Sequence, residues 1–191
     1  MGPYIESAKR QAHTIMTTLK EEHPDSNFLF GAVFYRDFED TPRFYIVPFK
    51  EDIAHDIQHV EACGGNDIPE DVAGGYQQIL DMDWKHADAK FCFHIADAPP
   101  HGILWHAQDI PDMHTTLVGR PLEDIIDDMH RHDIRLSIVR VNATLDIMIH
   151  NFRRIYGDAL NVMNLDHTAP TDTLFTETIT RHISSTLSLM D

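Results

Sequence analysis

Positive charge is scarce in this chain of 191 residues, in which 15 Lys and Arg stand against 31 Asp and Glu. The formal net charge at pH 7 is therefore −16. Nucleic acid and anionic lipid surfaces repel a protein of this charge, so we expect neither nucleic acid nor a membrane as a partner. The acidic balance suits the binding of cations, although a surplus of acids more often serves solubility alone.

Cysteine and long apolar runs are also lacking. The two cysteines, Cys63 and Cys92, are too few for a disulfide framework and fit a reducing compartment. No apolar run is long enough to cross a membrane. Residues 1–6 show neither a signal peptide nor the Ser or Thr that myristoylation needs at position six. We therefore expect a cytoplasmic protein.

Apolar runs of strand length alternate along the chain with amphipathic segments of helical length. This alternation predicts an α/β fold with an open, mostly parallel sheet that helices cover on both faces. The first two strands have a short polar connection and should form a hairpin. With no repeat and no linker, the chain is most simply one domain. The predicted strands are residues 28–35, 44–47, 91–96, 134–141 and 159–165, and the predicted helices are residues 3–22, 52–63, 69–82, 122–131, 144–156 and 172–189.

Asp97 ends the apolar run of residues 91–96 and is followed by Pro99, Pro100 and Gly102, which stop the strand. In open α/β sheets, ligands bind beyond the carboxyl ends of the strands. Asp97 therefore lies where a binding site is expected.

Two other loops bring acids to the same edge if the first predicted strand runs parallel to the strand before Asp97. The hairpin turn carries Asp37 and Asp40, and the glycine-rich loop before residue 69 carries Asp67. Carboxylates on loops suit a hard cation such as Mg²⁺. Each acid also has an ordinary explanation: Asp97 can form a turn before the prolines, Asp67 can cap the helix that follows it, and the hairpin acids can be solvated.

Three motifs stand in order along the chain: a hairpin motif, a loop that enters a helix, and a strand end. The motifs are Tyr35-Arg36-Asp37, Gly64-Gly65-Asn66-Asp67-Ile68-Pro69-Glu70-Asp71-Val72 and Ile95-Ala96-Asp97-Ala98-Pro99-Pro100-His101-Gly102. Together they resemble the von Willebrand factor A (vWA) domain, in the branch found beside alpha-type protein kinases, and the resemblance covers roughly residues 1–156. It implies a Rossmann-like, doubly wound sheet with one antiparallel edge strand and a metal-ion-dependent adhesion site at its carboxyl edge.

The first metal motif of that family, Asp-x-Thr-Gly-Ser-Met, has no counterpart, because Met1 corresponds to its end. The resemblance thus implies one vWA-like domain over residues 1–191, with a core to residue 166 and a C-terminal helix over 167–191, truncated at its start and lacking the first central strand. Asp67 and Asp97 remain as metal ligands, with Asp37 and Asp40 as possible additions. We expect Mg²⁺, or Mn²⁺, to bind weakly or not at all.

The resemblance implies a non-enzymatic protein-interaction domain for adhesion or scaffolding. Its partner is a protein that offers an acidic residue to the metal, and the sheet region left exposed by the missing strand could also pair two copies of the chain. One alternative is a targeting module of a larger alpha-type kinase. The sequence itself contains neither a glycine-rich phosphate loop nor a kinase catalytic signature.

Fourteen histidines raise a second alternative, a metal-dependent phosphoesterase that uses Asp97, His101, His106 and Asp109. No two of His94, His101, His106 and His114 have helical spacing on a credible helix. His55 and His59 do have that spacing, but they lie at the opposite edge from Asp97 if the predicted topology holds. We therefore interpret most of the histidines as surface groups or as groups that support a ligand.

Overall fold

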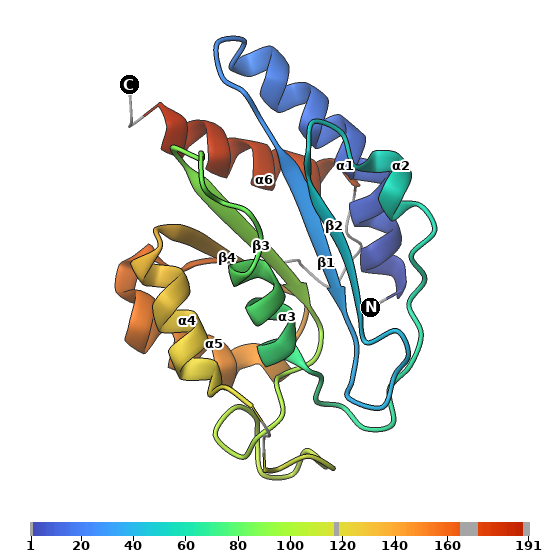
Figure 1. Ribbon diagram of the computed structural model, residues 1–191. Coiled ribbons are helices and arrows are strands. Elements are labelled where there is room, and N and C mark those ends of the chain that lie inside the picture. The colour runs from blue at the N-terminus through green and yellow to red at the C-terminus, as the bar shows by residue number, and fades with distance from the viewer. Residues whose placement is uncertain (1, 117–118, 165–171, 189–191) are drawn as a thin grey trace. The chain divides into compact units, whose positions relative to one another are not determined.

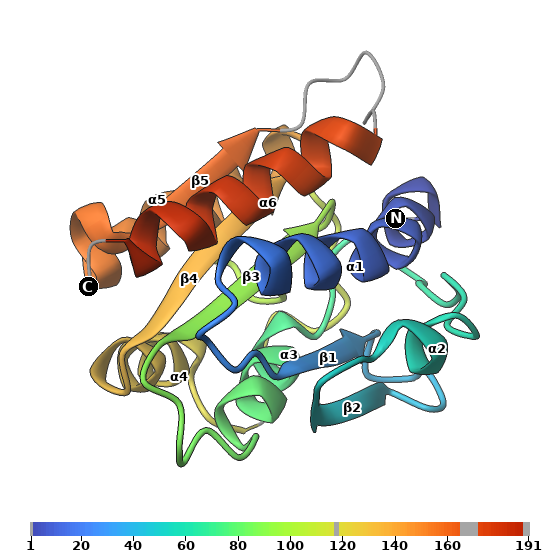
Figure 2. The same cartoon turned by 90° about the horizontal axis from the view of Figure 1, so that it is seen from above.

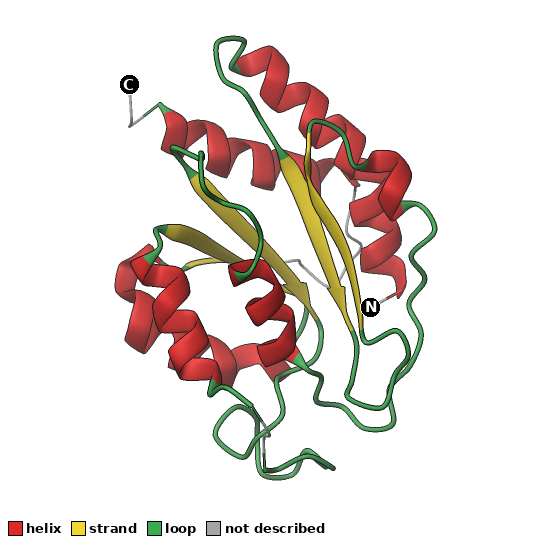
Figure 3. Ribbon diagram, in the orientation of Figure 1, coloured by secondary structure: helices red, strands yellow, loops and turns green. Residues whose placement is uncertain are grey.

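The computed structural model describes residues 2–116, 119–164 and 172–188, and its fold is mixed α/β (Figures 1 and 3). The predicted end of the last strand and the predicted boundary of the domain core, at residues 165–167, lie outside the described residues. The predicted end of the C-terminal helix, at residues 189–191, also lies outside them. The chain divides into two compact units, the first made of Met1–Ala32, Ile46–Ala62 and Leu165–Asp191 and the second of Val33–Tyr45 and Cys63–Asn164. The described residues contain no helix that is both long enough and apolar enough to cross a membrane.

The first unit is built on three helices: α1 (Gly2–Glu22), α2 (Ala54–Ile57) and α6 (Asp172–Leu187). Helix α1 packs against α6 and contacts α2. The predicted helices at the two ends of the chain are thus confirmed within the described residues. The predicted helix over residues 52–63 is wrong in its length. It ends after one turn, where the N–H of Val60 donates to the carbonyl of Ile57 and the Val60 side chain is buried.

The predicted hairpin is confirmed. Strands β1 (Phe30–Tyr35) and β2 (Phe44–Lys50) form a two-stranded sheet, closed at the turn by a bond of 3.0 Å from the Arg36 N–H to the Arg43 carbonyl. The turn and the adjoining strand ends belong to the second unit.

The second unit contains a parallel sheet of three strands in the order β3 (Lys90–Ala96), β4 (Ile134–Arg140) and β5 (Asn161–Asn164). Figure 2 shows the three strands side by side. The parallel character predicted for these strands is confirmed. The described strands nevertheless form two sheets instead of the single open sheet expected, since β1 has a ladder only with β2. The end of β1 meets β3 through side chains, where the Tyr35 hydroxyl lies 2.7 Å from Nε2 of His94.

Helices α3 (Val72–Leu80), α4 (Leu122–Arg131) and α5 (Asp146–Tyr156) pack in sequence, α3 against α4 and α4 against α5. Two short 3₁₀ turns, Ala143–Leu145 and Gly157–Ala159, flank α5. The helices and alternate residues of the strands share one core, as period-two strands require. Full burial of an Ile, Leu, Met or Phe side chain stabilises the folded chain by about 1.5–3 kcal/mol relative to leaving that side chain exposed. The core includes Tyr76, Cys92, Ala96, Ile125, Ile126, Met129, Ile134, Leu136, Ile138, Met148 and Phe152.

Helix α3 begins later than residue 69, the predicted start. Glu70 forms an isolated parallel β-bridge with Pro100, and this extended backbone delays the helix to Val72. Asp71 is the N-cap and accepts a bond of 2.8 Å from the Gly74 N–H. The role of Asp67 as the cap of this helix is therefore a wrong prediction, and its carboxylate is available for other contacts.

Candidate functional site

Three loops of the second unit meet beyond the carboxyl end of β3: the hairpin turn, the loop before α3 and the segment after Asp97 (Figure 1). The Glu70 N–H donates to the Pro99 carbonyl at 3.0 Å, and the His101 N–H donates to the Glu70 carbonyl at 3.4 Å. These backbone bonds fix the loop before α3 beside the segment that carries His101.

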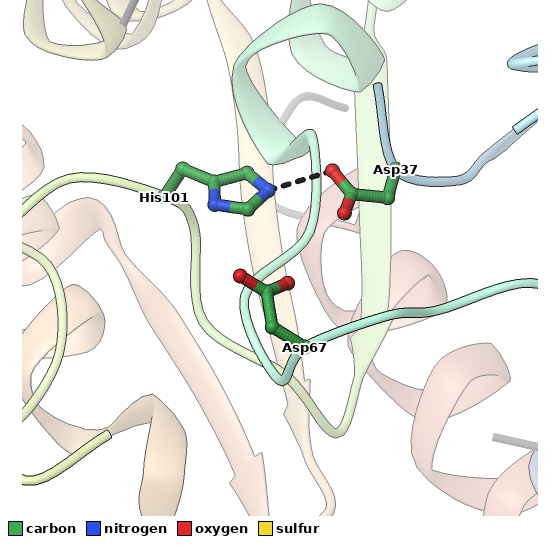
Figure 4. Close-up of side chains that lie close together, drawn as sticks. All are labelled: Asp37, Asp67 and His101. Atoms are coloured by element: carbon green, nitrogen blue, oxygen red, sulfur yellow. Dashed lines mark hydrogen bonds and ion pairs between the residues drawn. The ribbon is translucent and has the colours of Figure 1, made fainter. Parts of the chain in front are cut away.

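Asp37, Asp67 and His101 come together from these three loops (Figure 4). One potential ligand atom from each lies within 4.8 Å of those of the other two, and Nε2 of His101 is 2.7 Å from Oδ1 of Asp37. Asp37 is 2% exposed and His101 1%, whereas Asp67 is half-buried. We call these three residues the carboxylate–histidine cluster.

His101 lies between two carboxylates, because its Nδ1 is also 2.8 Å from Oδ1 of Asp112. Burial alone would lower the pKa of His101, but the hydrogen bonds to Asp112 and Asp37 outweigh burial and raise it. The imidazole is thus held by acids on both of its nitrogens.

Asp112 is itself held by four groups. Its carboxylate accepts from the N–H groups of Gly102 (2.8 Å) and His114 (2.7 Å), and it also bonds the rings of His101 and His106. Burial acts to raise the pKa of Asp112, but these bonds hold that pKa well below its usual range. Asp112 is therefore a fixed anion that orients His101.

Four carboxylate oxygens around the cluster are buried and have no hydrogen-bond partner among the described residues. They are Oδ2 of Asp37, Oδ2 of Asp40, Oδ1 of Asp67 and Oε2 of Glu70. Burial, followed by the charges of Asp37 and Asp40, raises the pKa of Glu70 to about 7. Buried anionic oxygens without donors are costly, so this arrangement favours a proton or a cation among them.

A second group of three lies beside the first and shares Asp37 with it. Its other members are Glu39, which is exposed, and His114, which is half-buried. Nε2 of His114 is 3.0 Å from Oε1 of Glu39, and the ring of Phe38 stacks on His101 with centroids 5.0 Å apart. The buried cluster thus continues to the surface through the hairpin turn.

Only two of the four predicted metal ligands lie in the cluster. Asp37 and Asp67 lie together with His101, whereas neither Asp40 nor Asp97 belongs to either group of three. Asp97 does follow β3 directly, as predicted, and its charge contributes to the raised pKa of Glu70. Binding of a metal by all four carboxylates stays a prediction.

The residues of the predicted phosphoesterase set are also only partly together. His101 and His106 are buried, so they are not among the surface histidines, and both bond Asp112. Asp109 is exposed and forms no part of either group. Asp112 was missed because it lies in an irregular loop. The available signal was the residue type, because an Asp in a loop often accepts from the N–H two residues on, as Asp112 does from His114.

Behind the cluster, His94 is buried between two tyrosines. The Tyr35 hydroxyl lies 2.7 Å from Nε2 of His94 and the Tyr76 hydroxyl 2.6 Å from Nδ1. Burial lowers the pKa of His94 to about 4 and raises the pKa of both tyrosines. These hydrogen bonds between uncharged side chains connect the end of β1 to β3 and α3. They therefore help to place the hairpin turn that carries Asp37.

No family model matches this chain. A curated protein of Dictyostelium discoideum, named "Alpha-protein kinase vwkA", is 30% identical over 146 residues, which are 74% of this chain and 23% of that protein. The chain thus spans about a quarter of the length of the relative. It is similar to one part of a protein that bears the name of an alpha-type kinase.

Proposed function

We propose that this chain is a non-catalytic protein-interaction domain of vWA type, belonging to a polypeptide related to the alpha-type protein kinases. The similarity to part of a protein with that name, together with the three motifs, supports the proposal. A Rossmann-like vWA fold is compatible with the parallel sheet and its helices. Such a domain would act as a scaffold or targeting module for the rest of the polypeptide.

The observation that carries the proposal is a set of four exposed apolar side chains on the loops that carry the cluster, Ile68, Ile103, Leu104 and Met113, which we call the apolar rim. Their exposed fractions are 46%, 69%, 64% and 62%, and they are half of the eight large apolar side chains exposed in the described residues. The Met113 N–H donates to Oδ2 of Asp67 at 2.6 Å, which places Met113 beside the cluster. Exposed apolar side chains gathered around polar groups mark protein-binding surfaces.

The partner that suits this surface carries an acidic side chain flanked by apolar ones. Its apolar groups would cover the rim, and its carboxylate would complete the coordination of a cation at the acidic loops. Mg²⁺ or Mn²⁺ held by Asp67 and Asp97, with help from Asp37 and Asp40, is the cation that the resemblance implies. Without a cation the acidic loops repel such a partner, so binding should depend on metal.

Site-specific photo-cross-linking tests the proposal. A photo-reactive residue at position 104 should capture a defined partner in the native cell, and the added change Ile103→Asp should reduce that product at least tenfold. The matched control is position 29, because Leu29 is 60% exposed in the other unit. The same products at positions 104 and 29, or a product at 104 that survives Ile103→Asp, would contradict the proposal.

The pair His101 and His106 on Asp112 gives the phosphoesterase alternative its one specific observation. Turnover of a generic phosphoester in the presence of Mn²⁺ or Zn²⁺, abolished by Asp97→Ala, would establish that alternative and exclude a non-catalytic domain. We expect no turnover above that of the metal ion alone.

A further inference from the structure

We propose that Asp37, Asp67 and His101 bind one transition-metal ion of the Zn²⁺ class, with Asp112 holding His101 in place. This set differs from the all-oxygen Mg²⁺ set by its nitrogen ligand and by leaving out Asp97. The inference needs only residues of the second unit, and it stands whether or not a protein binds the apolar rim.

The first support is the convergence of the three side chains. Figure 4 shows them pointing toward one another from separate loops. Their potential ligand atoms lie within 4.8 Å of one another, and ligands of a tetrahedral Zn²⁺ at about 2.0–2.1 Å lie roughly 3.3 Å apart. Nε2 of His101 lies only 2.7 Å from Oδ1 of Asp37, so an ion would replace the proton between these two atoms and move them slightly apart.

The second support is that the carboxylates keep free oxygens. Asp37 is 2% exposed, and its Oδ1 accepts from the Phe38 N–H and bonds His101, while its Oδ2 has no partner in the described part of the chain. Asp67 uses Oδ2 for the Met113 N–H, and its buried Oδ1 has no partner among the same residues. Each carboxylate is thus anchored through one oxygen and retains the other for a ligand.

The third support is the carboxylate behind the histidine. Metal-binding histidines commonly donate their other ring N–H to a carboxylate, which sets the tautomer and the direction of the ring. Asp112 lies 2.8 Å from Nδ1 of His101 and is fixed by two backbone N–H groups. Nε2 of His101 is thereby directed toward Asp37, at the place where the ion would bind.

The donor set determines the class of metal. One imidazole nitrogen and two carboxylate oxygens suit Zn²⁺ and its neighbours better than Mg²⁺, which prefers oxygen alone. Three protein ligands also leave a position open to water or to an external carboxylate.

Titration of the purified metal-free chain with Co²⁺, followed by visible absorption, tests the site. We expect one Co²⁺ per chain with ligand-field bands that Zn²⁺ abolishes and a hundredfold excess of Mg²⁺ leaves in place. Asp67→Asn, in a half-buried side chain, and His101→Gln should each remove the bands. Asp112→Asn should weaken binding 10–100-fold, as loss of such a supporting carboxylate does.

Asp109→Asn serves as the matched control and should bind Co²⁺ like the unaltered chain. Asp97→Asn instead separates the two ligand sets, because it removes a ligand of the all-oxygen Mg²⁺ set alone. Circular dichroism of every variant shows that it is folded, and Asp67→Asn carries the test if the buried His101→Gln does not fold. Bands that survive Asp67→Asn, bands lost in Asp97→Asn, or the absence of a stoichiometric spectrum would each overturn the proposal. The cross-linking test reports on partner binding, so the failures of the two proposals are distinguishable.

Discussion

Asp112 holds several groups of the segment beyond β3 together through its two carboxylate oxygens. It joins the buried rings of His101 and His106 to the backbone of their own loop. Removing one partner of a buried, hydrogen-bonded ion pair typically costs about 3–5 kcal/mol. We therefore predict that Asp112→Ala lowers the free energy of unfolding by about that amount in urea denaturation.

Asp109→Ala is the control for this prediction, because Asp109 lies in the same loop and is exposed. Exposed substitutions of this kind usually change stability by less than about 0.5 kcal/mol. Equal stabilities of the Asp112→Ala and Asp109→Ala variants would show that the bonds to Asp112 contribute little.

His94 gives the second prediction at the scale of a residue, a loss of stability in mild acid. Burial lowers its pKa from 6.5 to about 4, so between these values the unfolded chain takes up a proton that the folded chain does not. The contribution of His94 is complete above pH 6.5 and declines as the pH falls toward 4, by at most about 1.4 kcal/mol per pH unit.

Urea denaturation at pH 7, 6 and 5 of the unaltered chain and of His94→Gln isolates this effect, since the other titrating groups are common to both. The variant should be less stable at pH 7 and should lose less stability on acidification. Parallel pH profiles of the two proteins would contradict the assignment.

At the scale of the element, the loop before α3 depends on close contact with the hairpin turn. Gly64 has φ +97°, and a Cβ there would lie 1.9 Å from Oδ2 of Asp40. We predict that Gly64→Ala destabilises the chain by about 1–3 kcal/mol, from backbone strain together with displacement of Asp40. The drop in melting temperature in calorimetry measures it.

Gly119→Ala separates the two causes, because Gly119 has φ +129° but no atom within 4 Å of the added Cβ. The control should therefore cost less than Gly64→Ala. Equal losses in the two variants would mean that the contact with Asp40 contributes nothing beyond strain.

The elements were largely predictable from sequence, whereas the connections between them were not. Apolar runs located the hairpin, and the stop at Asp97 located the end of β3. The late start of α3 was hidden, since it results from the bridge of Glu70 to Pro100, a contact between distant segments. The sequence did bring Asp37 and Asp67 to the same edge, but the bond of His101 to Asp37 was hidden for the same reason, because the two residues are 64 positions apart.

At the scale of the whole molecule, the formal charge of −16 links the stability of the folded chain to the binding of cations. Like charges gathered in a folded chain repel one another, and the acids around the cluster include buried oxygens without donors among the described residues. An ion at this place would relieve that repulsion and would bind the folded chain in preference to the unfolded one. Metal binding should therefore appear as thermal stabilisation.

A thermal melt with Zn²⁺ and with a chelator tests the central claim most directly, that the loops beyond β3 form a metal-binding edge. A ligand at about 100 times its dissociation constant adds about 2.7 kcal/mol, or roughly 5–10 °C for a chain of this size. The account predicts such a rise for the unaltered chain and for Asp97→Asn, and none for Asp67→Asn. An unaltered chain that melts at the same temperature with Zn²⁺ and with the chelator would contradict it.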